Sequence, residues 1–385
     1  MKDLQLLGLA SLCGALSLAC SSEALDSSDE AESPKLTIEA VTPVLVYEPQ
    51  AKVKLSATAL AFNPTIEGEL WVALRQFPSG LPCTLTIDTG CAALPGAMAV
   101  VSDATSGTPS AVLKQDGNAW HFMRRPTAIA WGEELLFATC GEALTDNYED
   151  DGDDTPYAGP ALWSSDPAIF GVEPLPTQNG THLDMLHETP YCMGIAHEAA
   201  NAYWTFNGLA GSLDRVDFHA PHAIGGEDHD DGEVHRYIAG QLLRVPEVPS
   251  HLVYDSARSL VYVADTGHGR VLSVDPSTAV PGDDIKYYER LAARGEMDGA
   301  TATPLIPPGQ LQTPSGITLA DDVLYVTDNA TSRIHSFDTT GKALRIFDTG
   351  LPGGSLAGIV LGPDGSLYVA DRLSGNAYRV DIPAP

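Results

Sequence analysis

The chain has 385 residues and a formal net charge of −30, from 51 acidic and 21 basic residues. A surface of that sign repels phosphate backbones, which excludes nucleic acid as a partner. Hydrophobic residues make up 44% and charged residues 19%, which excludes a mainly disordered chain, and the 36 glycines and 28 prolines favour short strands joined by turns.

The first segment, residues 1–19, has the pattern of an export signal. Lys2 precedes an apolar run from Leu4 to Leu18, and the run ends just before Cys20. This resembles a bacterial lipoprotein signal peptide, in which Cys20 becomes the lipid-carrying first residue, although Ser17 stands where leucine is favoured. No later stretch has the roughly 18 apolar residues of a membrane span. We therefore expect an exported protein of the bacterial envelope, periplasmic or on the cell surface, whose membrane contact is the lipid anchor only.

Residues 20–36 are polar and acidic and are predicted to form a flexible tether. The rest of the chain, 37–385, is predicted to be one domain. Its first apolar segment, 41–47 (VTPVLVY), reads as a strand that stands before any repeated unit.

Repeated units then follow one another to the end of the chain. Segments 251–275, 316–338 and 358–381 share an apolar strand, a turn, a Leu/Val-Tyr-Val-x-Asp strand, a short polar loop and a third strand. More divergent copies cover 57–74, 128–140 and 194–208. One aromatic residue marks the second strand of each copy: Trp71, Phe137, Tyr203, Tyr262, Tyr325 and Tyr368.

These units resemble the NHL repeat and, more broadly, the six-bladed propellers of the NHL, gluconolactonase and amidating-lyase groups. The resemblance implies an all-β fold, a six-bladed β-propeller with four antiparallel strands (a to d) in each blade. The last copy ends after its third strand, 377–382. The strand at 41–47 is predicted to complete the last blade and close the ring, which removes exposed sheet edges. The alternative is that this strand packs elsewhere.

The cysteines test the strand order. If Cys20 carries lipid, four cysteines remain in the exported chain. Loops that lead into strand a and loops between strands b and c share one face, which brings Cys140 and Cys192 together in adjacent blades. We predict the disulfides Cys140–Cys192 and Cys83–Cys91, with free buried thiols as the alternative.

That same face collects polar side chains near the axis. His251 stands where other copies have glycine, and neutral imidazole is the commonest side-chain metal ligand. Amidating-lyase propellers hold zinc with histidines around the channel mouth. This likeness implies His251, His187 and His268 as metal ligands, with Asp265 or Asp184 as a catalytic base. The alternatives are a hydrogen-bonded histidine lining the channel and, for Asp265, an aspartate that caps a turn.

A second cluster lies at 218–237, on the opposite face by strand order. Glu227, His229 and Asp231 fall in register with a Ca²⁺-loop pattern, although two of the ligand types do not fit it. The acidic stretch 146–154 fits in a similar way. The alternative for both is a solvated acidic loop.

No G-x-S-x-G, Walker A or H-E-x-x-H motif occurs in the sequence. The sequence therefore favours a module that binds a small ligand or an envelope protein. The alternative function is a metal-dependent hydrolase or lyase with a His/Asp site at the channel mouth. No cofactor is certain from the sequence, and Zn²⁺ and Ca²⁺ are the two candidate ions.

Overall fold

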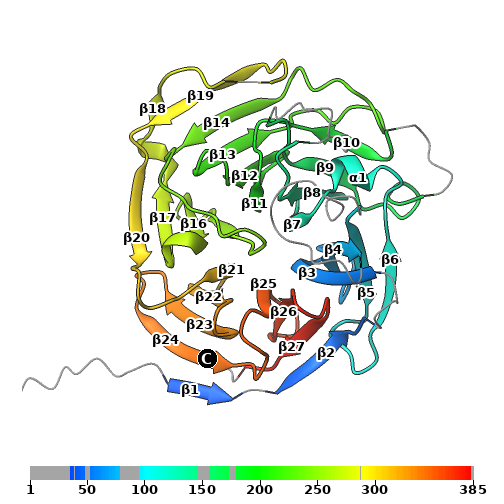
Figure 1. Cartoon of the computed structure of the whole chain (residues 1–385), viewed down its shortest axis with the longest axis vertical. Helices are drawn as coiled ribbons and strands as arrows, with labels where there is room; N and C mark the ends of the chain where they lie inside the picture. The colour runs from blue at the N-terminus through cyan, green and yellow to red at the C-terminus, as the bar shows by residue number, and fades with distance from the viewer. Residues whose placement is uncertain are drawn as a thin grey trace, which may run out of the picture. The chain divides into compact units, whose positions relative to one another are not determined.

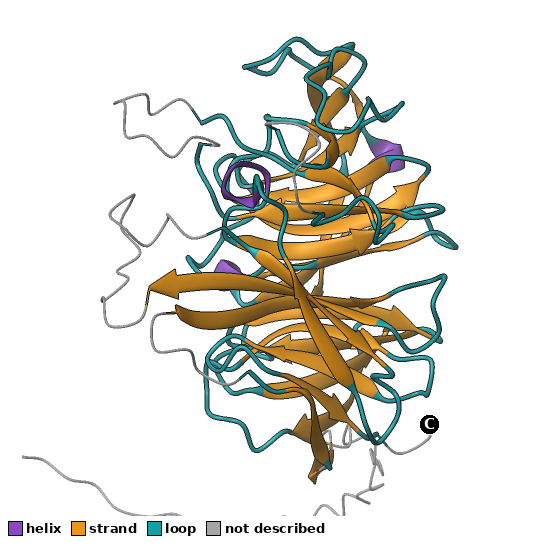
Figure 2. Ribbon diagram, turned by 90° about the vertical axis from the view of Figure 1, so that its right-hand side faces the viewer, coloured by secondary structure: helices purple, strands orange, loops and turns teal. Residues whose placement is uncertain are grey.

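Six β-sheets stand around a central axis as the blades of a propeller (Figure 1). The computed structural model describes residues 35–38, 40–47, 53–78, 95–145, 156–172, 179–286 and 288–382. All of them lie within one compact unit, Pro34–Pro385. The predicted all-β, six-bladed fold is confirmed. Viewed from the side, loops gather on both sides of the strands (Figure 2).

Each blade has four strands, which are consecutive in the chain except in blade 4, where β18 and β19 intervene, and in the last blade. Blade 1 holds β3 (Val53–Phe62), β4 (Leu70–Pro78), β5 (Ala97–Ser102) and β6 (Ser110–Lys114); blade 2 holds β7 (Pro126–Trp131), β8 (Leu136–Gly141), β9 (Ala161–Ser164) and β10 (His182–Met185). Blade 3 holds β11 (Cys192–Ala199), β12 (Ala202–Asn207), β13 (Ser212–Asp217) and β14 (Glu233–Tyr237); blade 4 holds β15 (Leu252–Asp255), β16 (Leu260–Asp265), β17 (Arg270–Asp275) and β20 (Thr301–Ile306). Blade 5 holds β21 (Pro314–Ala320), β22 (Val323–Asp328), β23 (Arg333–Asp338) and β24 (Ala343–Asp348); blade 6 holds β25 (Leu356–Leu361), β26 (Leu367–Asp371), β27 (Ala377–Val380) and β2 (Val41–Leu45).

The aromatic residue chosen for each repeat lies in the second strand of its blade, as predicted. A strand points successive residues to opposite faces, so each aromatic side chain lies on one face of its sheet and its neighbours in the strand lie on the other. They fill the space between blades: Trp71 of blade 1 meets Phe137 of blade 2 with ring centroids 5.1 Å apart. The apolar core therefore lies between neighbouring sheets rather than at one centre.

The ring is closed by the N-terminal strand, which confirms the predicted closure. β2 pairs antiparallel with β27, with Val41 opposite Val380 and Thr42 opposite Arg379. Val44 and Leu45 of β2 are buried. The last blade thus gains its fourth strand from the opposite end of the chain.

Two additions widen the sheets beyond the repeat pattern. β1 (Lys35–Ile38) pairs in parallel with β24, so the chain joins blade 5 within the stretch expected to be tether. An insertion between β17 and β20 forms β18 (Val280–Pro281) and β19 (Ala293–Asp298), and β19 pairs in parallel with β14. The insertion therefore crosses from blade 4 to the outer edge of blade 3.

The predicted disulfide between Cys140 and Cys192 is present, with Cα atoms 5.3 Å apart and both side chains buried. That separation is within the usual range for cystine. Cys83 and Cys91 lie outside the described residues, as does the acidic stretch 146–154. The helices of the described residues are short, α1 (Ala119–Phe122), η1 (Thr266–His268) and η2 (Pro276–Thr278), and no helix there is long and apolar enough to cross a membrane.

Candidate functional site

Inner strands are tied to one another around the axis by side-chain hydroxyls. Thr58 Oγ1 donates to Pro126 O over 2.9 Å, and Thr127 Oγ1 donates to Cys192 O over 2.6 Å. Each bond runs from one blade to the first strand of the next. The hub is therefore a hydrogen-bonded ring that holds the blade ends in place.

His251 fills the hub inside this ring. It precedes β15 in blade 4, and its Nε2 donates to Thr127 O of blade 2 over 2.9 Å. A Cβ atom at Gly358 of blade 6 would lie 3.1 Å from the His251 Cε1 atom, so glycine there leaves room for the imidazole. Burial lowers the pKa of His251 to about 4, which keeps the ring neutral. One imidazole thus spans the axis between three blades.

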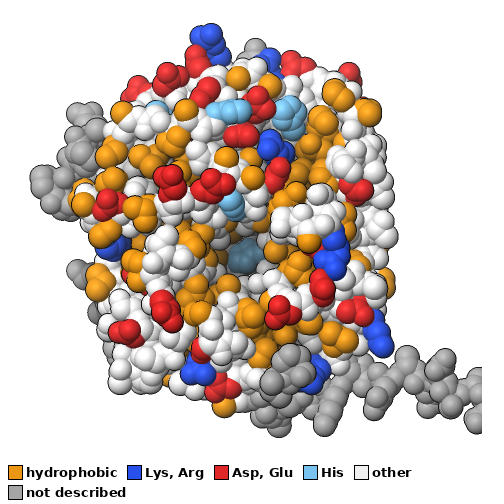
Figure 3. All heavy atoms as spheres, turned by 180° about the vertical axis from the view of Figure 1, so that it is seen from behind, with side chains coloured by type: hydrophobic (Ala, Val, Ile, Leu, Met, Phe, Trp, Pro, Cys, Tyr) orange, Lys and Arg blue, Asp and Glu red, His pale blue; other side chains and the backbone are white. Residues whose placement is uncertain are grey.

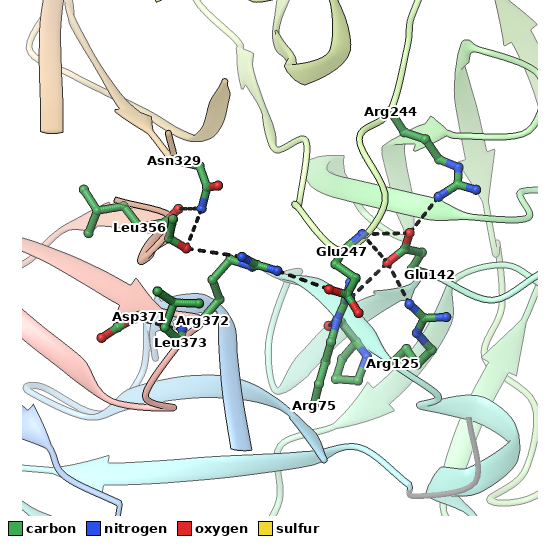
Figure 4. Close-up of polar contacts among 12 residues, drawn as sticks. Arg75, Arg125, Glu142, Arg244, Glu247, Asn329, Leu356, Asp371, Arg372 and Leu373 are labelled. Carbon is green, nitrogen blue, oxygen red and sulfur yellow. Dashed lines mark hydrogen bonds and ion pairs between the residues drawn. The ribbon is translucent and has the colours of Figure 1, made fainter. Parts of the chain in front are cut away.

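A charged cluster lies at the mouth of the hub (Figure 4). Its centre is Glu142, directly after β8, whose carboxylate accepts hydrogen bonds from Arg75 Nη1 at 2.9 Å and Arg244 Nη1 at 2.7 Å. Arg125 Nη2 adds a third contact at 3.3 Å, and the backbone N–H of Glu247 donates to both carboxylate oxygens. Segments of blades 1, 2 and the connection into blade 4 therefore meet at one carboxylate.

The cluster continues to blade 6 through Arg372, whose Nη2 lies 3.4 Å from Glu247 Oε2. Arg75 lies near the end of the second strand β4, and the other members follow a second strand or precede a first strand, positions that strand order puts on one face. Arg75 and Glu142 are only 1% and 2% exposed. Burial lowers the pKa of Arg75 to about 10, so the guanidinium stays charged. Burial acts to raise the pKa of Glu142, but the charges of Arg75 and Arg125 hold it below its usual value.

A second concentration of polar side chains forms a pocket at the rim of blades 2 and 3. The cavity has a volume of about 450 Å³. It is built from α1, β10, the β13–β14 segment and the inserted segment that contains Glu289. Two groups of three side chains could each hold a metal ion here, because within each group the ligand atoms lie within 4.8 Å of one another. The first group is His182, His222 and His229, and the second is His187, His229 and Glu289. In Figure 3 histidine and acidic side chains gather over the upper part of the ring, where β10 and β14 lie in Figure 1.

The structure does not bring His187, His251 and His268 into one ligand group. Among the described residues, the two groups at the rim contain His187 but neither of the others. His268 Nδ1 lies 2.8 Å from Asp265 Oδ2, and His187 Nδ1 lies 2.8 Å from Glu289 Oε2. His251 takes the position of a hydrogen-bonded histidine in the channel, the alternative stated above.

The structure also separates the three residues of the Ca²⁺-loop pattern. His229 belongs to both rim groups, and Glu227 borders the cavity with its Oε1 accepting from Asn179 Nδ2 at 2.8 Å. Asp231 instead accepts from the backbone N–H of Ala220 at 3.2 Å. The sequence had marked the loop through its acidic residues, whereas the structure groups its histidines.

The two candidate bases also differ. Asp265 is fully buried and accepts from the backbone N–H of Leu243 at 2.9 Å and from Arg270 Nε at 2.7 Å, which makes it part of the scaffold. Asp184 on β10 accepts from the N–H of Met185 at 2.7 Å, and its Oδ2 has no partner among the described residues. Burial raises the pKa of Asp184 to about 8.

Sequence reasoning missed the cluster at the hub mouth and most of the rim pocket. Arg75 lies in β4, whereas Glu142 and Arg244 lie in connections far from it in the chain, and no local spacing links the three. His182 lies on β10 and Glu289 in the inserted segment, and neither position is part of the repeat pattern. The repeat period could have flagged Arg75 and Glu142, because both fall near the end of a second strand.

The chain thus has the fold of the NHL- and gluconolactonase-like six-bladed propellers. No protein-family model matches it, and no curated protein matches its sequence. An auxiliary nutrient binding protein from Bacteroides thetaiotaomicron VPI-5482 shares 12% identity over 89% of this chain and 76% of that one, with a TM-score of 0.52. The calcium-binding protein regucalcin from Agrobacterium tumefaciens str. C58 shares 14% over 90% and 95%, with a TM-score of 0.52. A luciferin-regenerating enzyme shares 14% over 89% and 95%, with a TM-score of 0.50. At identities this low, the structural likeness shows a shared fold and nothing further.

Proposed function

We propose that the chain is a ligand-binding module of the bacterial envelope, exported by residues 1–19 and held to a membrane through lipid on Cys20. The signal-like pattern and the acidic stretch 20–36 support anchoring. The buried Cys140–Cys192 disulfide supports an oxidising compartment. A fold neighbour named as a nutrient binding protein is consistent with a binding role outside the cytoplasm.

The ligand we propose is a small anion with carboxylate or phosphate groups, taken at the hub mouth. The observation that carries this is a local excess of positive charge: four guanidinium groups surround two carboxylates in a chain of net charge −30. Arg125, Arg244 and Arg372 keep 21%, 22% and 17% of their side chains exposed. A guanidinium fork matches the geometry of carboxylate and phosphate oxygens, so these side chains are suited to bind such groups.

The fold neighbours carry different activities by name, so the fold does not choose between binding and catalysis. The geometry gives less support to a hydrolase or lyase that uses His251 at the channel mouth. Its Nε2 donates to Thr127 O, and the ring is enclosed by three blades. The hub arginines, in contrast, reach solvent.

The test is calorimetric titration of the full chain, purified in detergent, with citrate and inorganic phosphate, and with glucose as the uncharged control. We expect at least one anion to bind and Arg372→Gln or Arg244→Gln to weaken it about tenfold, as loss of a charge-assisted hydrogen bond requires. Arg333→Gln, at the outer part of blade 5 and 41% exposed, is the matched control and should leave affinity unchanged. Absence of anion binding, or binding that Arg372→Gln does not alter, would contradict the proposal.

A further inference from the structure

Three imidazoles converge at the rim pocket, on the outermost strand of blade 2 and the segment between β13 and β14. The ligand nitrogens of His182, His222 and His229 lie within 4.8 Å of one another. Neighbouring ring centroids are 5.0 Å apart for His182 and His222, and 5.3 Å for His222 and His229. We propose that these three histidines bind a borderline divalent metal ion, Zn²⁺ in the first instance, independently of any ligand at the hub.

Hydrogen bonds fix the same nitrogen of each ring as the donor. Nδ1 of His182 lies 2.9 Å from Asn179 O, and Nδ1 of His222 lies 2.7 Å from Ala223 O. Nδ1 of His229 bonds to Met185 O. A carbonyl only accepts, so each Nδ1 carries a proton, and in the neutral form of each ring Nε2 keeps its lone pair. Carbonyl partners of this kind orient metal-binding histidines in known sites.

Two of these lone pairs are buried without a partner among the described residues. Nε2 of His182 and Nε2 of His222 are inaccessible to solvent and make no hydrogen bond there. The His182 side chain is fully buried and stacks on Phe122 at 3.8 Å. Burying an unsatisfied polar atom is unfavourable, and a metal ion satisfies both nitrogens at once.

The loop that carries His222 is held against β10 before any ion binds. The backbone N–H of His222 donates to Leu183 O over 3.0 Å, and the N–H of Gly225 donates to His182 O over 2.8 Å. A Cβ atom at position 226 would lie 2.8 Å from His222 Nδ1, so Gly226 gives the ring its room. The ligands therefore come from a preorganised frame, which lowers the entropy lost on binding.

The ligand chemistry selects the class of ion. Three neutral imidazoles suit Zn²⁺, Cu²⁺, Ni²⁺ or Co²⁺, whereas Ca²⁺ and Mg²⁺ require oxygen ligands. Zinc–nitrogen bonds of about 2.0–2.1 Å in a tetrahedron need nitrogens about 3.3 Å apart. In the structure the ligand nitrogens lie within 4.8 Å of one another, so the rings have to move closer together when the ion binds. The cavity borders His182 and His229, so a water or a small ligand can reach the fourth position.

Acidic groups around the pocket favour the approach of a cation. Glu227 and Asp230 border the cavity, and Glu289 holds His187 through its carboxylate, with Oε2 2.8 Å from Nδ1. Ring centroids of His187 and His229 are 5.6 Å apart. The group formed by His187, His229 and Glu289 shares His229 with the first. His187 already pairs with Glu289, whereas the other rings hold open lone pairs, so we assign the ion to the first group.

The test is titration of the full chain, purified in detergent and stripped with a chelator, with Zn²⁺ by calorimetry and with Co²⁺ by visible absorption. We expect one ion per chain, the intense visible bands of four-coordinate Co²⁺, and a rise in melting temperature with Zn²⁺ that equimolar Ca²⁺ does not give. His182→Gln and His222→Gln should each weaken Zn²⁺ binding by about 100-fold or more. His219→Gln, in the same segment but 42% exposed, is the matched control and should bind as the unaltered chain does.

His222 is only partly buried, so His222→Gln tests the site even if His182→Gln fails to fold. The melting temperature of each variant with chelator present checks its fold. The proposal is overturned if the unaltered chain takes up no Zn²⁺, or if His222→Gln binds it with unchanged affinity. Loss of binding in His187→Gln and Glu289→Gln, with His182→Gln and His222→Gln unaffected, would move the ion to the second group and refute the assignment. Anion binding at the hub is a separate measurement, so either proposal can fail alone.

Discussion

Acid should destabilise this propeller through His251, and the effect can be isolated by His251→Gln. The imidazole is enclosed in the hub, and burial lowers its pKa from an ordinary value of 6.5 to about 4. Between these two pH values, His251 is therefore protonated in the unfolded chain and neutral in the folded chain. The contribution of His251 is present in full above about pH 6.5 and is lost as the pH falls towards about 4.

The magnitude follows from the size of that interval. One pKa unit corresponds to about 1.4 kcal/mol, so a fall from 6.5 to about 4 corresponds to about 3 kcal/mol. Thr127 O is the ring's hydrogen-bond partner, and no charged group is among the causes of the shift. The pH dependence expected from His251 therefore comes from its burial and not from an ion pair.

The measurement is the free energy of unfolding by urea across this pH range, for the unaltered chain and for His251→Gln. Glutamine does not titrate, so the free energy of unfolding of the unaltered chain should fall by about 3 kcal/mol more than that of His251→Gln as acid is added. His182 and the other buried histidines are common to both proteins and cancel in the difference, and a chelator keeps metal out of the rim pocket. His219→Gln removes a half-exposed histidine that solvent hydrates in both states. A gap between the unaltered chain and His251→Gln that stays constant within about 0.5 kcal/mol would refute the reasoning.

Three further predictions concern the ties between blades. Glu142→Gln leaves the buried Arg75 guanidinium without its charge partner and should lower the free energy of unfolding by about 3–5 kcal/mol, whereas Arg75→Met with Glu142→Leu should recover most of that loss in the same urea assay. Replacing Cys140 and Cys192 by alanine frees a loop with a sequence separation of 52, which should cost about 4 kcal/mol; equal stability of the oxidised and double-alanine chains would contradict it. Val44→Ala with Leu45→Ala removes buried contacts of β2 and should lower the free energy of unfolding by roughly 3–6 kcal/mol. The expected readouts are a lower melting temperature and aggregation through the β27 edge in size-exclusion chromatography. An unchanged melting temperature would show that β2 contributes little to closure of the ring.

The repeat made the ring predictable from sequence. Each blade repeats an aromatic residue in its second strand, so Trp71 and Tyr368 could be aligned although they lie near opposite ends of the chain. Counting strands then left one spare at the start and one missing at the end, and β2 fills that gap. The Cys140–Cys192 pair followed from strand polarity alone.

The sites were less predictable because their residues do not follow the repeat. Glu289 reaches His187 only because the insertion after β17 pairs in parallel with β14, and parallel pairing leaves no local turn to recognise. The position of His251 at the axis was foreseen, but its imidazole donates to Thr127 O instead of joining a ligand set. Side-chain direction at a shared position depends on packing from other blades, which sequence spacing does not encode.

The pairing of β2 with β27 also dictates when the molecule can become whole. Tyr47 N donates to Asn376 Oδ1 across a sequence separation of 329, so β2 has no strand to pair with until β27 is in place. Contacts of such long range form slowly, so a partly folded chain exposes the edges of both β2 and β27. The incomplete ring is therefore the state in which this chain is most prone to associate with other copies through those edges.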